Sequence, residues 1–177
     1  MGYKIRKDEC YSEGPYRYVL AVDTDSGSDK TLVLVQCNPS VANGKRSDPT
    51  VGKVSYWAEE NGFKTVVFLN LFAYVSSDTA NLEDKSHDLL VGPKNDETLA
   101  KYIVHGSTVV LAWGGSVPVS NEHYLQRVTE IKQRLDHAQV TPYRVGNLSY
   151  GRYPRHGRMW NKGNRQLLPL EWSAILL

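Results

Sequence analysis

Two asparagines and a Trp-Gly pair follow three short apolar runs, and these residues are the first candidates for chemistry. The runs, with the residues that follow them, are Thr31–Val35 with Asn38, Thr65–Leu69 with Asn70, and Thr108–Ala112 with Trp113-Gly114. An asparagine amide both donates and accepts hydrogen bonds, so Asn38 and Asn70 could position a water molecule or read the polar edge of a ligand. Continuous apolar runs are typical of parallel strands buried on both faces, and ligands bind outside the carboxyl ends of such strands. We therefore expect the three strand ends to share one crevice.

Helices between the runs are expected to hold the strands in this arrangement. One helix is predicted from Pro49 to about Glu60. Asp48 can cap it, Pro49 suits its first turn, and Asn61-Gly62 can end it. The other elements expected are helices from Gly92 to about His105 and over Asn121–Ala138, and a last strand over Val140–Val145. Alternating strands and helices predict an α/β fold, a three-layer α/β/α sandwich with a mainly parallel central sheet.

The chain is expected to form one domain over residues 1–177, since this length suffices for one core. The three parts expected are an N-terminal hairpin over 17–36, an α/β core over 31–145, and a basic irregular segment with a docked tail over 146–177. The polar stretch 23–30 separates the two apolar runs of the hairpin, and a long polar loop is expected over 76–90.

The composition excludes several classes of protein. Hydrophobic residues make up 41% of the chain and charged residues 23%, which is ordinary for a soluble protein. No apolar stretch is long enough to span a membrane and the first residues do not resemble a signal peptide, so no membrane partner is expected. The two cysteines offer neither a disulfide framework nor metal-ligand spacing, and a reduced, cytoplasmic setting is expected.

No metal or cofactor is expected. Four histidines are placed on loop or helix surfaces that share no face: His87, His105, His123 and His137. No glycine loop with the spacing of a phosphate-binding or dinucleotide motif is present, because the glycines at 114–115 lack the required continuation. Ser40 has no evident local base, so a triad-type nucleophile is not supported either.

The C-terminal part carries a basic and aromatic segment. No acidic residue occurs between Asp136 and Glu171, whereas tyrosines and a tryptophan alternate with cations there. The candidates for phosphate binding are Arg144, Arg152, Arg158 and Lys162. Cations beside aromatic faces suit a partner that carries phosphates and bases, so a nucleic acid or a nucleotide is the expected partner. The alternative is a solvated basic loop with a few packed tyrosines.

Several fragments together resemble a bacterial and phage domain-of-unknown-function family, which is marked by LNPS, DPT, NLFA, WG and a late PRHP. The fragments are Cys37-Asn38-Pro39-Ser40, Asp48-Pro49-Thr50, Asn70-Leu71-Phe72-Ala73, Val91–Asp96, Ala112-Trp113-Gly114 and Pro154-Arg155-His156. They occur in the family's order and the resemblance spans roughly residues 17 to 157. Cys37 replaces the usual Leu, which should matter little. Gly157 replaces the second Pro of PRHP, which is expected to loosen the loop that holds His156.

The same fragments bear a more distant resemblance to the uracil-DNA glycosylases. Those enzymes have strands ending in GQDP or GINP, in LLLN-x-L and in LLWG, followed by a late HPS loop. The corresponding segments here are Gln36–Pro39, Phe68–Leu71, Leu111–Gly114 and Pro154–His156, in that order. The resemblance implies a glycosylase-like fold in which Asn38 positions the attacking water and Asn70 reads a pyrimidine edge. It also implies that His156 stabilises the departing base anion.

The chemistry of base release fits these residue types. Cleavage of an N-glycosidic bond builds negative charge on the base, so hydrogen-bond donors near the base and a positioned water promote it. Asn38 cannot take up a proton, and the resemblance to GINP enzymes implies a slow activity. Asp48 is the nearest candidate base, although capping of the helix is the alternative role. The other candidate ligand-binding side chains are Ser40, Phe72, Trp113 and Arg155.

The leading interpretation is a glycosylase-like protein that acts on or binds a base in nucleic acid, as a DNA N-glycosylase-like hydrolase if it is catalytic. One alternative is a protein that binds or hydrolyses a nucleotide or modified nucleoside. Another is a non-catalytic module on a glycosylase-like fold that binds nucleic acid or protein, with Leu71, Phe72 and Tyr74 as a stacking surface in any of these. Asn70 could instead satisfy turn amides, and Trp113 could be a packing residue. A base in a duplex would also have to be flipped out of the stack.

Overall fold

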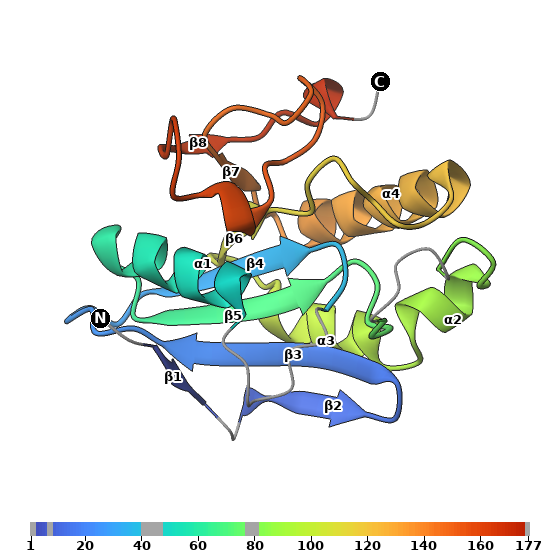
Figure 1. Cartoon of the computed structure of the whole chain (residues 1–177), viewed down its shortest axis with the longest axis horizontal. Coiled ribbons are helices and arrows are strands. Elements are labelled where there is room, and N and C mark those ends of the chain that lie inside the picture. Colours follow the sequence, from blue (N-terminus) through green and yellow to red (C-terminus); the bar gives the residue numbers. More distant parts are fainter. Residues whose placement is uncertain (1–2, 7–8, 40–47, 77–81, 176–177) are drawn as a thin grey trace.

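The computed structural model describes residues 3–6, 9–39, 48–76 and 82–175, and within them eight strands form one sheet. The strands are β1 (Lys4–Ile5), β2 (Tyr11–Glu13), β3 (Tyr16–Asp23), β4 (Thr31–Gln36), β5 (Thr65–Asn70), β6 (Thr108–Leu111), β7 (Tyr143–Val145) and β8 (Leu167–Pro169). The helices are α1 (Pro49–Glu60), α2 (His87–Val91), α3 (Asn95–Tyr102) and α4 (Asn121–His137), with short 3₁₀ helices η3 (Gly157–Met159) and η4 (Trp172–Ala174). The strand order is β1-β3-β5-β4-β6-β7-β8, and β2 also pairs with β3 (Figure 1).

The four central strands, β5, β4, β6 and β7, are parallel, whereas the outer strands β1, β2, β3 and β8 pair antiparallel. The sheet is therefore mixed, and the expectation of a mainly parallel sheet holds for its centre. Strands β4 and β5 have the predicted bounds, but β6 ends at Leu111 and β7 begins only at Tyr143. Pro142 lies directly before β7 and has no N–H to donate to a neighbouring strand.

The predicted hairpin over 17–36 is wrong. Strand β3 pairs antiparallel with β5, with Leu20 opposite Phe68, while β4 lies on the other side of β5 and is parallel to it. The polar stretch between β3 and β4 is bound to the residues that precede β5, because the Thr24 hydroxyl donates to the carbonyl of Phe63 at 2.7 Å. The stretch therefore crosses the start of β5 instead of turning back as a hairpin. The hairpin partner of β3 is β2.

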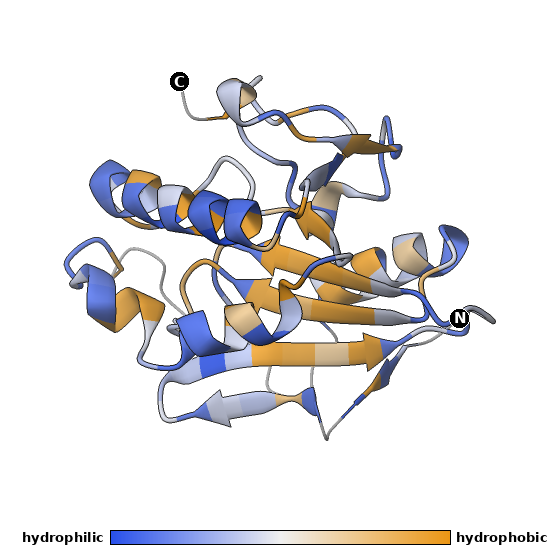
Figure 2. Cartoon of the chain, turned by 180° about the vertical axis from the view of Figure 1, so that it is seen from behind, coloured by the Kyte–Doolittle hydropathy of each residue, from blue (hydrophilic) through white to orange (hydrophobic). Residues whose placement is uncertain are grey.

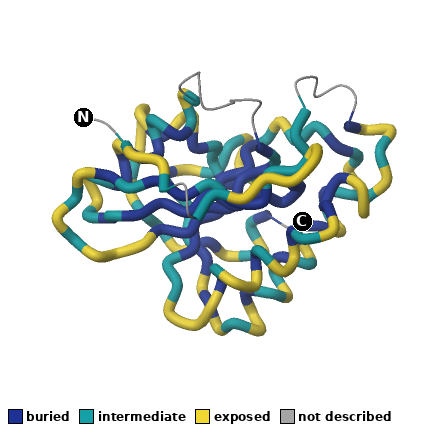
Figure 3. Tube along the Cα trace, turned by 90° about the horizontal axis from the view of Figure 1, so that it is seen from below, coloured by how far each residue is buried: buried dark blue, intermediate teal, exposed yellow. Residues whose placement is uncertain are grey.

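Both faces of the central sheet are buried, and successive strand residues alternate between two apolar clusters. Val33 and Val35 belong to the cluster formed with α3 and α4, whereas Leu32 and Leu34 belong to the cluster formed with α1. The central strands are hydrophobic along most of their length while α4 carries a hydrophilic outer surface (Figure 2). The burial-coloured trace likewise shows the strands as the buried middle of the molecule (Figure 3). The protein is thus a three-layer α/β/α arrangement, as predicted.

Two of the three predicted helices, α1 and α4, are confirmed, and the third is shorter than expected. Helix α3 covers only Asn95–Tyr102, and a separate helix α2 forms where a long loop was expected. Gly92 ends α2 with a backbone φ of +83°, a left-handed conformation that favours glycine. The apolar tail docks as predicted: β8 pairs with β7, and the side chains of Leu170 and Ile175 are buried. None of the helices found in the described ranges is long and apolar enough to cross a membrane.

Candidate functional site

The carboxyl ends of β4, β5 and β6 lie side by side at one edge of the sheet. Gln36 is paired with Asn70, and beyond this pair the amide of Phe72 donates to the carbonyl of Cys37 at 2.9 Å. On the other side of β4, the amide of Ala112 donates to the carbonyl of Val35 at 2.8 Å. The residues that follow these strands therefore emerge at the same edge of the sheet, as predicted.

The segment 154–156 is attached to this edge through the Trp-Gly turn. The amide of Gly114 donates to the carbonyl of Pro154 at 2.8 Å, and Gly114 has a φ of +77°. A Cβ atom at Gly114 would lie 2.9 Å from the Cβ of His156, closer than such atoms approach in proteins. Both the positive φ and the close approach of His156 therefore require a glycine here. Because glycine has no side chain, His156 packs directly against the turn.

His156 is held in one tautomer. Its Nδ1 accepts a hydrogen bond from the backbone amide of Arg158 at 3.1 Å, so Nδ1 carries no proton in the neutral ring. Burial lowers the pKa of His156, and the nearby charge of Arg158 lowers it further, while Asp48 opposes both effects. At neutral pH the side chain is therefore an uncharged imidazole with its proton on Nε2. Such a ring can donate one hydrogen bond through Nε2–H.

Gly157 does not loosen the loop that holds His156, so that expectation is wrong. Gly157 is buried against helix α1, and a Cβ atom there would lie 2.6 Å from the Cγ2 of Val54. The glycine therefore allows η3 to pack closely against α1. The segment that carries His156 is clamped between the Trp-Gly turn on one side and α1 on the other.

Asp48 caps helix α1 and also contributes charge to the site. Its Oδ1 accepts hydrogen bonds from the amides of Thr50 at 2.8 Å and Val51 at 3.4 Å, as the capping interpretation predicted. Burial lowers the pKa of His156 and of Arg17, and the negative charge of Asp48 opposes this lowering in both. The candidate base and the candidate donor are thus electrostatic neighbours.

Arg17 is a member of this group that the sequence analysis missed. It lies at the start of β3, where burial lowers the pKa of its guanidinium. Its carbonyl accepts a hydrogen bond from the Nδ2 of Asn70 at 3.3 Å, so it joins Asn70 to the surroundings of Asp48. The available signal was a single cation within an otherwise apolar and aromatic strand, Tyr16–Asp23.

Asn70 is buried at the end of β5, with only 2% of its surface exposed. Its Nδ2 donates to Arg17, but its Oδ1 has no hydrogen-bond partner within the described part of the chain. A buried acceptor without a partner is unusual in folded proteins and is often explained by a functional role or an unseen water. The turn-satisfying role considered for Asn70 is not seen in the described part of the chain, because its Oδ1 accepts no turn amide there and its Nδ2 donates to a strand carbonyl.

Side chains from two helices hold the backbone around Asn70 through hydrogen bonds. Asn95, at the start of α3, donates through Nδ2 to the carbonyls of Asn70 and Leu71, both at 3.0 Å. Arg127, a fully buried cation of α4, donates through Nε to the same carbonyl of Leu71 at 2.7 Å. Arg127 also forms ion pairs with Asp96 and Glu130. These contacts fix the strand end that presents Asn70, and Arg127 gave no sequence signal beyond its helical position.

A cavity of about 610 Å³ opens beside His156. Its lining comes from the Trp-Gly turn and from the basic segment, and consists of Trp113, Gly114, Gly115, Ser116, Ser149, Tyr150, His156, Arg158 and Met159. The cavity volume falls in the range of small-ligand sites. The site thus combines a pocket, a neutral hydrogen-bond donor and a nearby carboxylate.

A comparison with protein-family models gives a match over residues 17–157 to a family described as a protein of unknown function, DUF1643. The chain belongs to the DUF1643 family. The match covers the span that the sequence motifs indicated. Searches of curated proteins and of solved structures each found no match.

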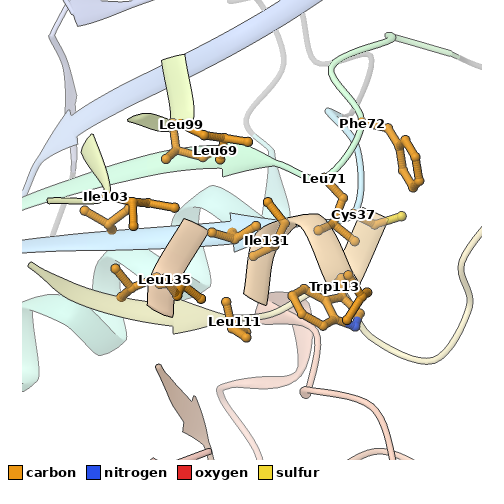
Figure 4. Packing of buried hydrophobic residues seen from close by; sticks show 14 of the residues in the cluster. Cys37, Leu69, Leu71, Phe72, Leu99, Ile103, Leu111, Trp113, Ile131 and Leu135 are labelled. Atoms are coloured by element: carbon orange, nitrogen blue, oxygen red, sulfur yellow. The ribbon is translucent and has the colours of Figure 1, made fainter. Parts of the chain in front are cut away.

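Within this DUF1643 chain, three residues expected at the crevice are packed in the core, and of these Trp113 also lines the cavity. Phe72 and Trp113 are each 1% exposed, Leu71 is fully buried, and Figure 4 shows them with the cluster of apolar side chains on the α4 side. The indole of Trp113 donates to the hydroxyl of Tyr124 at 3.1 Å. The expected stacking surface of Leu71 and Phe72 is therefore wrong, because both side chains are needed to fill the core. Trp113 is a packing residue beside the cavity.

Cys37 belongs to the same apolar cluster. The side chain is buried, and burial raises the pKa of its thiol to about 12. It therefore remains protonated and behaves as a small apolar residue. Asn38 beside it is half-buried and its Nδ2 lies 3.5 Å from the carbonyl of Pro39. Ser40 lies outside the described residues.

The candidate phosphate-binding cations divide into two groups. Arg155 donates to the carbonyls of Asn164 at 2.8 Å and Lys162 at 2.5 Å, and Arg144 donates to the carbonyl of Gly146. These two guanidinium groups hold the irregular C-terminal segment together. The side chains that are exposed are those of Arg152, Arg158 and Lys162.

The expectation that the histidines share no face is wrong for two of them. The rings of His87 and His123 lie 5.5 Å apart between α2 and α4, and His87 Nε2 lies 3.3 Å from a carboxylate oxygen of Glu130. Phe72 packs edge-on against His87. Through Phe72, the pair of His87 and His123 thus packs against the turn that follows Asn70. In the described ranges, no group of three or more His, Cys, Asp or Glu side chains is placed to hold a metal ion.

Proposed function

We propose that this DUF1643 protein binds a nucleobase in the cavity beside His156 and releases it slowly, as a glycosylase-like hydrolase. The observation that carries the proposal is His156, a residue of the cavity lining whose tautomer leaves the proton of the neutral ring on Nε2. A neutral donor of this kind can stabilise negative charge that develops on a departing base. The charge is then shared by a hydrogen bond and no proton has to be lost from the enzyme.

Three residues outside the described lining of the cavity would supply the remaining requirements of the reaction. The buried Oδ1 of Asn70 has no partner among the described residues, and it could receive an N–H from the base edge if the base reaches past this lining. The carboxylate of Asp48 could orient water and stabilise positive charge on the sugar, while Asn38 could hold the water through its amide. Because Asp48 already accepts two backbone amides as a helix cap, we expect it to be a weak base and the reaction to be slow.

The direct test offers oligonucleotides that carry uracil, mismatched bases or modified pyrimidines and measures abasic sites by alkaline strand cleavage. His156→Ala and Asn70→Ala should each lower the rate by about a hundredfold to a thousandfold, as expected for loss of a charge-stabilising or base-reading group. Asp48→Asn should lower it less, because asparagine is also a good helix cap. His105→Ala, at an exposed histidine, is the matched control and should leave the rate unchanged.

Two outcomes would change the assignment. Binding without any abasic product would leave a non-catalytic module on this fold. A folded Asp48→Asn variant without activity would make Asp48 the essential base.

A second candidate function is the binding or hydrolysis of a single nucleotide or modified nucleoside. It is favoured by the cavity volume of about 610 Å³ and by the internal use of Arg144 and Arg155. This function predicts tight binding of a mononucleotide with little dependence on salt. The nucleic-acid function predicts binding that weakens steeply as salt is added.

A further inference from the structure

Tyr150 is an exposed aromatic residue at the rim of the cavity. Its surface is 84% exposed, the highest value among the large hydrophobic residues described as exposed. Its backbone φ is +52°, in the left-handed region that residues other than glycine rarely adopt. Backbone strain of this kind persists where the surroundings enforce it and is concentrated at functional sites. Burial of the side chain does not account for the strain here, because the ring is exposed.

The turn that carries Tyr150 is well defined. Ser149 and Tyr153 pair through two backbone hydrogen bonds, of 2.8 Å and 3.0 Å. Gly151, which follows Tyr150, also has a positive φ, of +72°. The paired residues therefore close a tight turn and hold Tyr150 at its tip, beside the cavity.

The ring of Tyr150 packs against the backbone at Gly115. A Cβ atom at Gly115 would lie 2.6 Å from the Cδ2 of Tyr150 and 3.2 Å from the Cδ2 of Tyr153. Only a glycine allows the two rings to approach the backbone of this turn so closely. Tyr150 is thus supported by the backbone on one side while most of its surface remains open to solvent.

The surroundings of the ring match the chemistry of a nucleotide strand. Arg158 and Met159 line the same cavity, and the Met159 side chain is 44% exposed. The guanidinium of Arg152 lies over the ring of Tyr153, 5.1 Å from its centre. Exposed cations beside an open aromatic face are the combination that binds phosphates and stacks bases of single strands.

We infer that Tyr150 stacks against the base next to the one held in the cavity, so that the preferred ligand is an unpaired strand of at least two nucleotides. This inference rests on the proposed function and adds the substrate class to it. A neighbouring base can present its face to Tyr150 only when it is not enclosed in a duplex stack. A free base or nucleoside would occupy the cavity without supplying a second base for Tyr150 to stack on.

The test compares the binding of mononucleotides, dinucleotides and eight-residue homopolymers of each base to the full chain by equilibrium fluorescence. A second nucleotide should tighten binding about 5-fold to about 150-fold, the range measured when stacking of one base is lost. Tyr150→Ala should remove this gain and weaken dinucleotide binding far more than mononucleotide binding, while Tyr150→Phe should retain the gain. Tyr56→Ala, at an exposed tyrosine of α1 outside the cavity lining, is the matched control.

Gly115→Ala gives an independent check, since the added methyl group would displace the ring of Tyr150 without removing it. It should reproduce the loss caused by Tyr150→Ala. Equal binding of mononucleotides and dinucleotides would overturn the inference and leave the cavity as a single-nucleotide site. Equal weakening of both ligands by Tyr150→Ala would also overturn it, because Tyr150 would then belong to the cavity itself. Failure of every nucleotide to bind would overturn the proposed function together with the inference.

Discussion

At the scale of single residues, the site depends on a histidine whose charge and tautomer are set by its surroundings. The Nδ1 of His156 is occupied by the amide of Arg158, and burial lowers its pKa. Because the folded protein binds this proton less readily than the unfolded chain, protonation opposes folding. The stabilisation that comes from keeping His156 neutral is present above pH 6.5, the ordinary pKa of histidine. It is lost as the pH falls through the lower pKa of His156 in the folded state.

The first prediction is that His156→Asn will make stability less sensitive to acid. Between pH 6.5 and the lowered pKa of the folded protein, the free energy of unfolding of the parent chain should fall more steeply than that of the variant. Urea denaturation at a series of pH values measures both slopes, and the NMR titration of the imidazole gives the pKa directly. Parallel slopes, or a His156 pKa above 6.5, would contradict this account.

The second prediction concerns the close packing of Gly157. Gly157→Ala would bring a methyl group within 2.6 Å of Val54 Cγ2 and should destabilise the protein by roughly 1–3 kcal/mol, the usual cost of overpacking. Gly27→Ala is the control, because no atom lies within 4 Å of the added carbon there and Gly27 has no positive φ. Thermal unfolding of the two variants should therefore differ. A Gly157→Ala variant as stable as Gly27→Ala would mean that η3 can move away from α1 at little cost.

At the scale of elements, helices α3 and α4 hold the end of β5 through polar side chains that reach its backbone. Asn95 and Arg127 meet at the carbonyl of Leu71, and Arg127 is at the same time ion-paired to Asp96 and Glu130. The guanidinium of Arg127 is buried while both carboxylates reach solvent, so the group that depends most on Arg127 is the carbonyl of Leu71. The position of Asn70 is therefore tied to the packing of two helices.

The third prediction follows from this arrangement. Arg127→Met should lower the free energy of unfolding by roughly 1.5–3 kcal/mol, because the buried carbonyl of Leu71 loses a charged donor while Asp96 and Glu130 remain solvated. Arg134, like Arg127, belongs to α4, but it is more exposed and lies 3.5 Å from Asp96. Arg134→Met should therefore lower the free energy of unfolding by less than about 1 kcal/mol. Urea denaturation compares the two variants. Equal losses would show that the carbonyl of Leu71 does not depend on the guanidinium.

The same scale explains which parts of the fold could be predicted from the sequence. Strands β4 and β5 and helix α1 have the predicted bounds because their signals are local: a continuous apolar run, or an Asp-Pro cap with apolar residues at helical spacing. The partner of β3 could not be read locally, because antiparallel pairing with β5 depends on which strand takes the centre of the sheet.

The site divides in the same way. Asn38, Asn70 and Trp113 were recognised because each follows a strand end. The contact of Arg17 with Asn70 and the clamp made by Arg127 join segments 53 and 56 residues apart, and no local pattern reports such contacts.

At the scale of the whole molecule, the distribution of charge decides between the two proposed ligand classes. The basic segment carries cations of two kinds: Arg144 and Arg155 are bound to backbone carbonyls, whereas Arg158 and Lys162 are exposed, and Arg158 lines the cavity. Only the exposed group is available to phosphates without disturbing the fold of the segment. The net charge of +2 alone would not reveal this division.

The fourth prediction is therefore a salt dependence that changes with particular cations. If a single strand is bound, the logarithm of its affinity should fall linearly with the logarithm of salt concentration, and Arg158→Gln and Lys162→Gln should each reduce the slope by about 0.7. Arg155→Gln should instead lower the melting temperature, since its guanidinium connects the carbonyls of Lys162 and Asn164. Fluorescence titrations of an eight-residue strand at several salt concentrations measure the slopes. An unchanged slope in the Arg158→Gln and Lys162→Gln variants, together with tight and salt-independent binding of a mononucleotide, would favour the single-nucleotide function, because one small ligand displaces few counterions.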